Sequence, residues 1–180
     1  MIRPRGGDFV YSRQEFELMK EDVFFCKSAN VAGIVFGILT ENGSVDIARC
    51  REIFALASPL KATFHRAFDS CANYRAALEE IIALGFERVL TSGGEANAFA
   101  GVCLIQELVQ LAAGRISIMP GGGINEKNII STAQVTGASE FHTTAKKSLT
   151  GNNVDIDYQT DLNTVMNLVS LLKNYKSHGS

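Results

Sequence analysis

The sequence has no excess of basic residues, no long apolar run and no cysteine-dense segment, and each absence excludes a class of protein. Its 17 lysines and arginines against 19 acidic residues give a formal net charge of −2, and no basic–aromatic stripe indicates a nucleic-acid partner. No apolar run approaches the roughly 20 residues of a membrane span, and the first residues lack the apolar core of a signal peptide. We therefore expect neither nucleic acid nor a membrane as a partner.

The use of cysteine points to a reducing compartment. The four cysteines are widely spaced in a chain of 180 residues, which is long enough to bury one core without disulfide staples. The sequence also has no C-x-x-C pair, no methionine-rich tract and no two histidines four residues apart. We expect reduced, mostly buried thiols in a single cytoplasmic domain over residues 1–180.

The most informative motif is the segment MPGGGIN at residues 119–125. Ile116 and Ile118 precede it, and a helical pattern over 125–136 follows it. Three glycines between a strand and a helix allow positive φ and a close approach of the backbone to a ligand, while the free N–H groups of a helix start attract an anion. The motif is not a P-loop, because no Gly-Lys-Ser/Thr follows. It predicts an anion site, and a tight turn that merely requires glycine is the alternative.

A short strand followed by a helix recurs six times along the chain. The expected strands cover residues 1–5, 33–39, 61–66, 88–92, 115–119 and 140–145. The expected helices cover residues 12–29, 46–57, 73–84, 97–113, 125–136 and 161–175. Helix signals support this order, among them a capping box of Ser12 with Glu15 and the N-cap residues Asp46 and Asn73. The polar segment 146–160 is predicted to be a flexible loop before the last helix.

Alternating strands and helices imply parallel pairing with right-handed crossovers. This pattern fits either a doubly wound open sheet or a TIM (β/α)8 barrel. Polar residues lie within the expected strands, namely Thr63, His65, Ser92, Glu140 and His142. Such residues are common toward the mouth of a barrel and unusual in the apolar central strands of a doubly wound sheet. We predict an α/β fold of the TIM-barrel type, which is incomplete because six βα units fall short of eight.

Five segments together closely resemble the CutC family of copper homeostasis proteins. They are MIRPRGGDF at 1–9, TFHRAFD at 63–69, FERVLTSG at 86–93, MPGGGI at 119–124 and EFH at 140–142. The resemblance implies a TIM barrel, a role in copper homeostasis with copper bound as Cu(I), and a location in the cytoplasm and, for animal members, the nucleus. It also implies that the chain lacks the first two βα units of the family. We therefore expect exposed strand edges and association into a homo-oligomer.

Polar residues gather at the carboxyl ends of the predicted strands, which meet at one mouth in a barrel. The candidate catalytic residues are His65, Arg3, Asp69 and Glu140, and the candidate anion-binding residues are Arg5, Arg66, Ser92, Gly121, Gly122 and Gly123. Arginine clamps a carboxylate or phosphate, and His65 is expected to shuttle a proton near neutral pH, oriented by Asp69 or Glu140. Because side chains alternate along a strand, His65 and Arg66 are not expected to point inward together. The alternative is an ion-pair network that closes the barrel end.

The candidate metal ligands are Cys71, His65 and His142, because Cu(I) prefers Cys, Met and His. Cys71 is the only thiol expected near the mouth, whereas Cys26 and Cys50 fall on the core faces of helices. The family resemblance, and not this residue chemistry, suggests copper. Three hypotheses follow: a Cu(I)-binding homeostasis protein, a TIM-barrel enzyme acting on a small anionic metabolite that bears phosphate or carboxylate, or a truncated product whose only role is to form oligomers.

Overall fold

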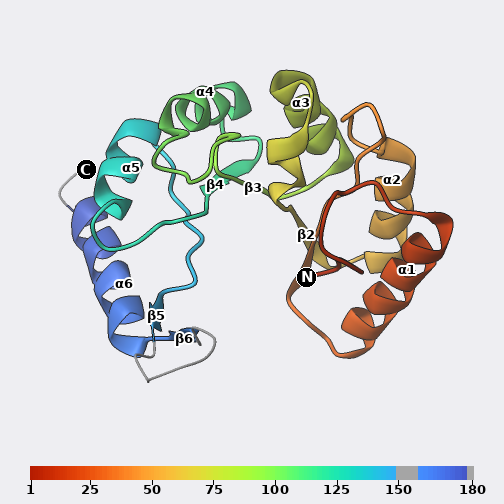
Figure 1. The fold of residues 1–180 in the computed structure, drawn as a ribbon, viewed down its shortest axis with the longest axis horizontal. Helices are drawn as coiled ribbons and strands as arrows, with labels where there is room; N and C mark the ends of the chain where they lie inside the picture. The colour runs from red at the N-terminus through yellow and green to blue at the C-terminus, as the bar shows by residue number, and fades with distance from the viewer. Residues whose placement is uncertain (149–157, 178–180) are drawn as a thin grey trace.

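A computed structural model describes residues 1–148 and 158–177. It shows a curved arc of strands with helices on its outer side (Figure 1). The sheet runs in the order β1 (Gly33–Phe36), β2 (Lys61–Phe64), β3 (Arg88–Thr91) and β4 (Ser117–Pro120), and each strand is parallel to its neighbour. This arrangement confirms the predicted α/β fold of the barrel type, with the barrel open on one side over the described residues.

Six α-helices and one short 3-10 helix accompany the strands in the described residues. They are α1 (Arg13–Ser28), α2 (Ile47–Ala57), η1 (Arg66–Ser70), α3 (Tyr74–Leu84), α4 (Val102–Ala112), α5 (Ile129–Thr136) and α6 (Leu162–Ser177). The capping box of Ser12 with Glu15 begins α1. The side chains of Asp46 and Asn73 accept an amide N–H in the first turn of α2 and of α3. These bonds satisfy N–H groups that a helix start leaves unpaired, and they confirm the three predicted starts.

The apolar core lies between the outer face of the sheet and the helices. Phe36 of β1 and Phe64 of β2 are fully buried there. Phe54 of α2 packs edge-on against Phe86, with ring centroids 4.6 Å apart, and the Phe36 and Phe86 centroids are 4.9 Å apart. Burying each such side chain contributes roughly 1.5–3 kcal/mol. This core holds the sheet rigid and leaves its concave face to form a site.

The predicted strand at residues 1–5 is absent. Only the amide of Ile2 bonds to the carbonyl of Val35, at 2.8 Å. Pro4 has no N–H to donate to a strand ladder, and the Arg3 guanidinium bonds to the carbonyl of Gly7 at 2.7 Å. The strand prediction was wrong because local bonds replace the ladder here.

The predicted strand at 140–145 is reduced to a single parallel bridge between His142 and Gly121. The helices α4 and α5 also begin later than predicted. Asn97 accepts the amide of Ala100 at 3.0 Å, and Asn125 accepts the amide of Lys127 at 2.9 Å. Asparagine side chains compete in this way for backbone N–H groups and hold turns instead of helix.

The predicted flexible loop at 146–160 is described only at its two ends. These ends form β5 (Lys146–Ser148) and β6 (Tyr158–Thr160), which pair antiparallel, while residues 149–157 lie outside the described part. Figure 1 shows β5, β6 and α6 at one end of the arc, α1 at the other, and the N-terminus on the inner side of the arc near β2. Among the described helices, none has the length and apolar character needed to cross a membrane.

Candidate anion-binding cleft

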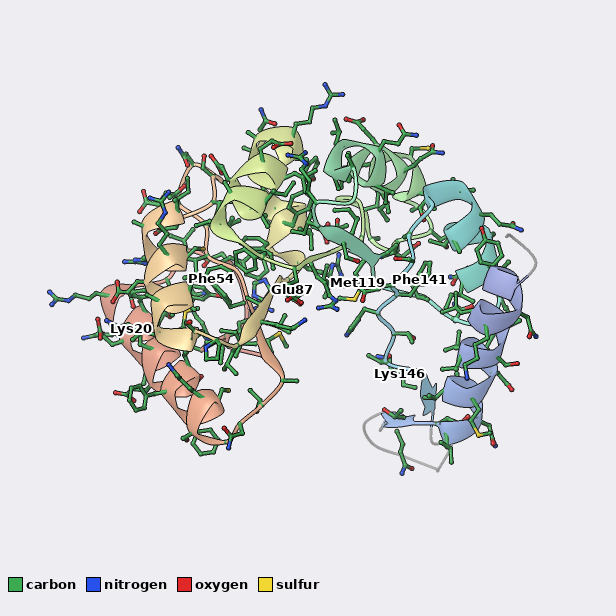
Figure 2. All side chains as sticks on the ribbon, turned by 180° about the vertical axis from the view of Figure 1, so that it is seen from behind. Lys20, Phe54, Glu87, Met119, Phe141 and Lys146 are labelled. Carbon is green, nitrogen blue, oxygen red and sulfur yellow. The ribbon has the colours of Figure 1, made fainter. Side chains whose placement is uncertain are left out.

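The concave side of the sheet forms a cleft made of two adjoining cavities. The first, of about 350 Å³, is lined by alternate strand residues such as Thr63 and Met119, and Figure 2 shows Met119 on this concave side. The second, of about 380 Å³, lies beside the glycine run at Gly122. Arg66, Leu90 and His142 line both cavities, so the two cavities adjoin along these side chains and are together called the cleft.

His65 lines the cleft where β2 ends and η1 begins. Its side chain is 4% exposed, and its Nδ1 accepts the amide N–H of Ala67 at 3.2 Å. Burial, together with the positive charge of Arg3, lowers the pKa of His65 to about 4. The neutral ring therefore carries its proton on Nε2, which is buried and bonds to no partner among the described residues. This protonation state argues against the predicted proton shuttle near neutral pH.

Arg66 is held in place by Asp69. Its Nε donates to Asp69 Oδ2 at 2.7 Å and its Nη2 donates to Ser92 Oγ at 2.6 Å. Asp69 also accepts the hydroxyl of Thr91 and the amide of Ser92. These bonds do not involve His65, so Asp69 fixes Arg66 and the end of β3 and does not orient the histidine as predicted.

His65 and Arg66 both line the cleft, although strict alternation predicted that only one would. The reason is local, because β2 ends at Phe64 and the backbone turns into η1 at Arg66. The guanidinium of Arg66 then reaches the glycine run, where a Cβ at Gly122 would lie 3.4 Å from its Nη1.

Arg3 lines the first cavity together with Phe9 and His65. The Arg3 Cζ lies 4.6 Å from the centroid of the Phe9 ring, and the Phe9 and His65 ring centroids are 5.0 Å apart. The Nε of Arg3 is buried and bonds to no partner among the described residues. Arg3 thus presents both a positive charge and an unpaired donor near His65.

Two predicted site residues lie away from the cleft. Arg5 donates to Glu15 at 2.6 Å and to Asp8 at 2.8 Å, which ties the N-terminal segment to α1. Glu140 accepts two bonds from Arg88, at 2.8 and 3.0 Å. Arg88 begins β3, so Glu140 lies at the end of the sheet opposite the mouth. Ion pairing explains both positions, and neither residue lines the two cavities described above.

The glycine run has the backbone that the motif predicts. Gly122 and Gly123 have φ values of 100° and 74°, and Gly121 leaves no room for a Cβ beside Leu90. The helix that follows is more distant than predicted, since α5 begins at Ile129. Any anion beside the run would therefore meet loop amides and Arg66, and not the first turn of a helix.

The predicted metal ligands do not come together. Cys71 is buried with its Sγ 3.7 Å from the Ala67 carbonyl, and burial, with nearby carboxylates, raises the pKa of its thiol to about 12. Cys71 does not line the two cavities, whereas His65 and His142 do. The described residues contain no group of three His, Cys, Asp or Glu side chains able to hold a metal ion. A protonated Nε2 on His65 also offers a hydrogen and not a lone pair, so this side of the cleft does not fit copper.

The charge of the cleft is one-sided. The described residues lining its two cavities include Arg3, Arg66 and Lys146, and they include no aspartate or glutamate. Sequence reasoning missed Lys146, Leu90 and Phe9 as lining residues. The in-and-out alternation of β3 indicates Leu90, whereas no local pattern distinguishes Lys146. A wall of this kind attracts anions and repels cations.

Comparison with known proteins gives a consistent set of relatives. A family model described as the CutC family matches residues 1–147. A mouse protein named copper homeostasis protein cutC homolog is 51% identical over 148 residues, which are 82% of this chain and 54% of that protein. A CutC family protein of Parabacteroides distasonis is 49% identical over 81% of this chain and 60% of its own length. The chain thus spans little more than half the length of these curated relatives.

Solved structures agree with this result. A crystal structure of CutC from Streptococcus agalactiae has a TM-score of 0.75 at 34% identity, over 78% of this chain and 69% of that one. A structure described as native KDPGal has a TM-score of 0.57 at 10% identity, over 96% of this chain and 69% of that one. At so low an identity, the second likeness concerns the fold alone.

Proposed function

Because this chain belongs to the CutC family, we propose that it takes part in copper homeostasis and binds copper as Cu(I). The match to the family over residues 1–147 carries this proposal, and the name of the mouse relative, copper homeostasis protein cutC homolog, supports it. We place the protein in the cytoplasm and the nucleus, acting as a homo-oligomer. Microscopy of the tagged chain tests the location.

A Cu(I) titration under reducing conditions, against a competing chromogenic chelator, tests copper binding. We expect stoichiometric binding that weakens at least tenfold in His142→Ala, because His142 lines both cavities, whereas Cys71→Ser should leave it unchanged, because Cys71 lines neither of them. Cys103→Ser is the matched control, because Cys103 is exposed on α4 and outside the cleft. Absence of stoichiometric binding in the wild-type chain would refute the copper proposal.

The geometry of the cleft supports a second candidate better than it supports copper. We propose that the cleft is the site of an enzyme acting on a small anionic metabolite, in which Arg66 binds the anionic group and Arg3 and His65 contact the rest of the molecule. The single observation behind this candidate is a wall that carries cations and neutral donors and no carboxylate among its described residues. Guanidinium groups bind carboxylate and phosphate through paired hydrogen bonds.

Calorimetric titration with inorganic phosphate and with acetate tests this candidate. We expect saturable binding of one of the two anions and at least a tenfold loss in Arg66→Ala. Arg75→Ala serves as the control, because Arg75 pairs with Glu107 on the outer surface. If neither anion binds, or if Arg66→Ala and Arg75→Ala bind equally well, the anion site is refuted.

A further inference from the structure

We propose that the cleft binds a small phosphorylated carbonyl compound. Its carbonyl oxygen accepts hydrogen bonds from His65 and Arg3, and its phosphate lies between Arg66 and the glycine run at 121–123. This inference rests on the second candidate function above and names the ligand class of that site.

Two buried donors at one end of the cleft have no acceptor in the described residues. His65 Nδ1 is committed to the Ala67 amide at 3.2 Å, so the N–H of its neutral ring is on Nε2. That atom and the Nε of Arg3 are both buried, and both are without partners in the described residues. Buried donors normally have an acceptor. Arg3 Cζ lies 4.6 Å from the Phe9 ring centroid and the His65 ring centroid lies 5.0 Å from it, so a single ligand oxygen with two lone pairs beside Phe9 would serve both donors. A carbonyl oxygen is such an acceptor, and donors that are already in place stabilise the negative charge on it.

The route to these donors passes through movable side chains. Because His65 Nε2 is itself covered, a ligand oxygen reaches it only when neighbouring side chains shift. Arg3 and Phe9 line the same cavity and are only half buried. Arg3 donates a hydrogen bond to the Gly7 carbonyl, and its guanidinium also interacts with the Tyr11 hydroxyl and the Phe9 ring. We assign the opening movement to this pair.

The other end of the cleft has donors suited to a phosphate. Asp69 and Ser92 hold the Nε and Nη2 of Arg66, while its Nη1 makes no hydrogen bond with the described residues and faces Gly122. The amides of Gly123 and Ile124 donate no hydrogen bond within the described part of the chain. Phosphate binds where a fixed guanidinium lies beside free loop amides. Both are present here, and no carboxylate lines this cavity among the described residues.

The two ends share one cleft, since Arg66 and Leu90 line both cavities. A ligand that contacts both ends must carry a phosphate at one end and an uncharged acceptor at the other. A metal ion does not meet this requirement, because every lining group that the argument uses is a donor or a cation.

Calorimetry with a matched pair of probes tests the proposal. Dihydroxyacetone phosphate and glycerol 3-phosphate differ only in a carbonyl against a hydroxyl group, and inorganic phosphate reports the phosphate end alone. We expect dihydroxyacetone phosphate to bind at least tenfold more tightly than glycerol 3-phosphate. His65→Leu should abolish that preference and leave the affinity for inorganic phosphate unchanged, while His65→Gln, which keeps an N–H near the same place, should restore part of it.

A measurement on the wild-type chain guards against a His65 variant that fails to fold. Nitrogen-15 NMR should show His65 as the Nε2–H form, with the Nε2–H resonance shifting when dihydroxyacetone phosphate is added. The Nδ1–H form would overturn the proposal, as would equal affinity for the two phosphate esters. If Arg66→Ala still weakens inorganic phosphate in that case, the anion site stands and only the carbonyl assignment fails. If no phosphate compound binds but acetate does, the anion site stands and this proposal fails, and if acetate does not bind either, both fail.

Discussion

At His65, burial and the positive charge of Arg3 set the protonation state. The unfolded side chain has a pKa near 6.5, and the folded one has a pKa of about 4. Between these values the unfolded chain binds a proton that the folded chain does not, so acid favours unfolding. The stability that the neutral His65 contributes is complete above pH 6.5 and is lost progressively as the pH falls toward 4, by roughly 3 kcal/mol in all.

Urea unfolding followed by circular dichroism at pH 7, 5.5 and 4 measures this loss. Carboxylates also titrate near pH 4 and change the stability of both proteins. The effect of His65 is therefore measured by the difference in unfolding free energy between wild type and His65→Leu at each pH. We expect the free energy of unfolding of His65→Leu to fall less steeply over this range. Parallel curves for the two proteins would mean that His65 is not held neutral.

Asp69 is the residue on which the mouth of the cleft depends. It accepts hydrogen bonds from Arg66, Thr91 and Ser92. Asp69→Asn removes the charge that holds the guanidinium and turns one acceptor oxygen into a donor, so we expect a loss of about 2–4 kcal/mol in unfolding free energy. Glu107→Gln, which breaks an exposed pair with Arg75, should cost less than about 1 kcal/mol. Equal losses in chemical denaturation would contradict the role assigned to Asp69.

Single residues differ in how far the sequence places them. His65 and Arg66 could be placed at the mouth because they follow an apolar strand directly. The position of Glu140 could not be predicted in this way, because its partner Arg88 lies 52 residues away in the sequence. No local sequence pattern indicates an ion pair between residues so far apart. The tautomer of His65 could not be predicted from the sequence either, because it depends on a hydrogen bond from the Ala67 amide that forms only where the chain turns into η1.

At the scale of elements, the glycines of the strand–helix connections differ in what surrounds them. A Cβ at Gly101 would collide with the backbone carbonyl of Ser92, one at Gly121 would collide with the Leu90 side chain, and one at Gly6 would meet nothing within 4 Å. A backbone cannot move aside as a half-exposed side chain can. We therefore expect alanine to cost more than about 3 kcal/mol at Gly101, about 1–2 kcal/mol at Gly121 and within about 0.5 kcal/mol of zero at Gly6.

Thermal melts of the three alanine variants check this order. The wild-type chain sets the reference, and Gly6→Ala controls for the loss of glycine flexibility in the unfolded state. A Gly121→Ala variant less stable than Gly101→Ala would show that the connection between β3 and α4 is looser than described.

Helices and strands were predicted best where their own sequence contains the residues that start or stop them. Helices with a side-chain cap, as at Ser12, Asp46 and Asn73, begin within one residue of the predicted place. The predictions for α4 and α5 were early because asparagine favours turns as well as caps. The edge segments failed because a strand exists only where a neighbour completes its ladder, and the sequence of one segment does not contain its neighbour.

On the scale of the whole molecule, apolar side chains are exposed at both ends of the arc. Phe24 and Phe25 of α1 are 70% and 73% exposed, and Leu162 and Met166 of α6 are 71% and 61% exposed. Leu162 and Met166 are four residues apart and share one helix face. Exposed large apolar groups that gather on one face mark interaction surfaces more often than chance positions do, and a second copy of this chain offers the same two faces.

We therefore expect the chain to self-associate in a concentration-dependent way. Sedimentation velocity from about 1 to 100 μM should show the weight-average sedimentation coefficient rising, because burial of these side chains outweighs the entropy lost on association. Phe25→Ser and Met166→Ser should each weaken association at least tenfold. Phe99→Ser is the matched control, because Phe99 is 54% exposed but lies before α4, apart from both faces. A single monomeric species at every concentration would show that the exposed faces of α1 and α6 do not bind another copy, and the apolar residues there would then need a different partner.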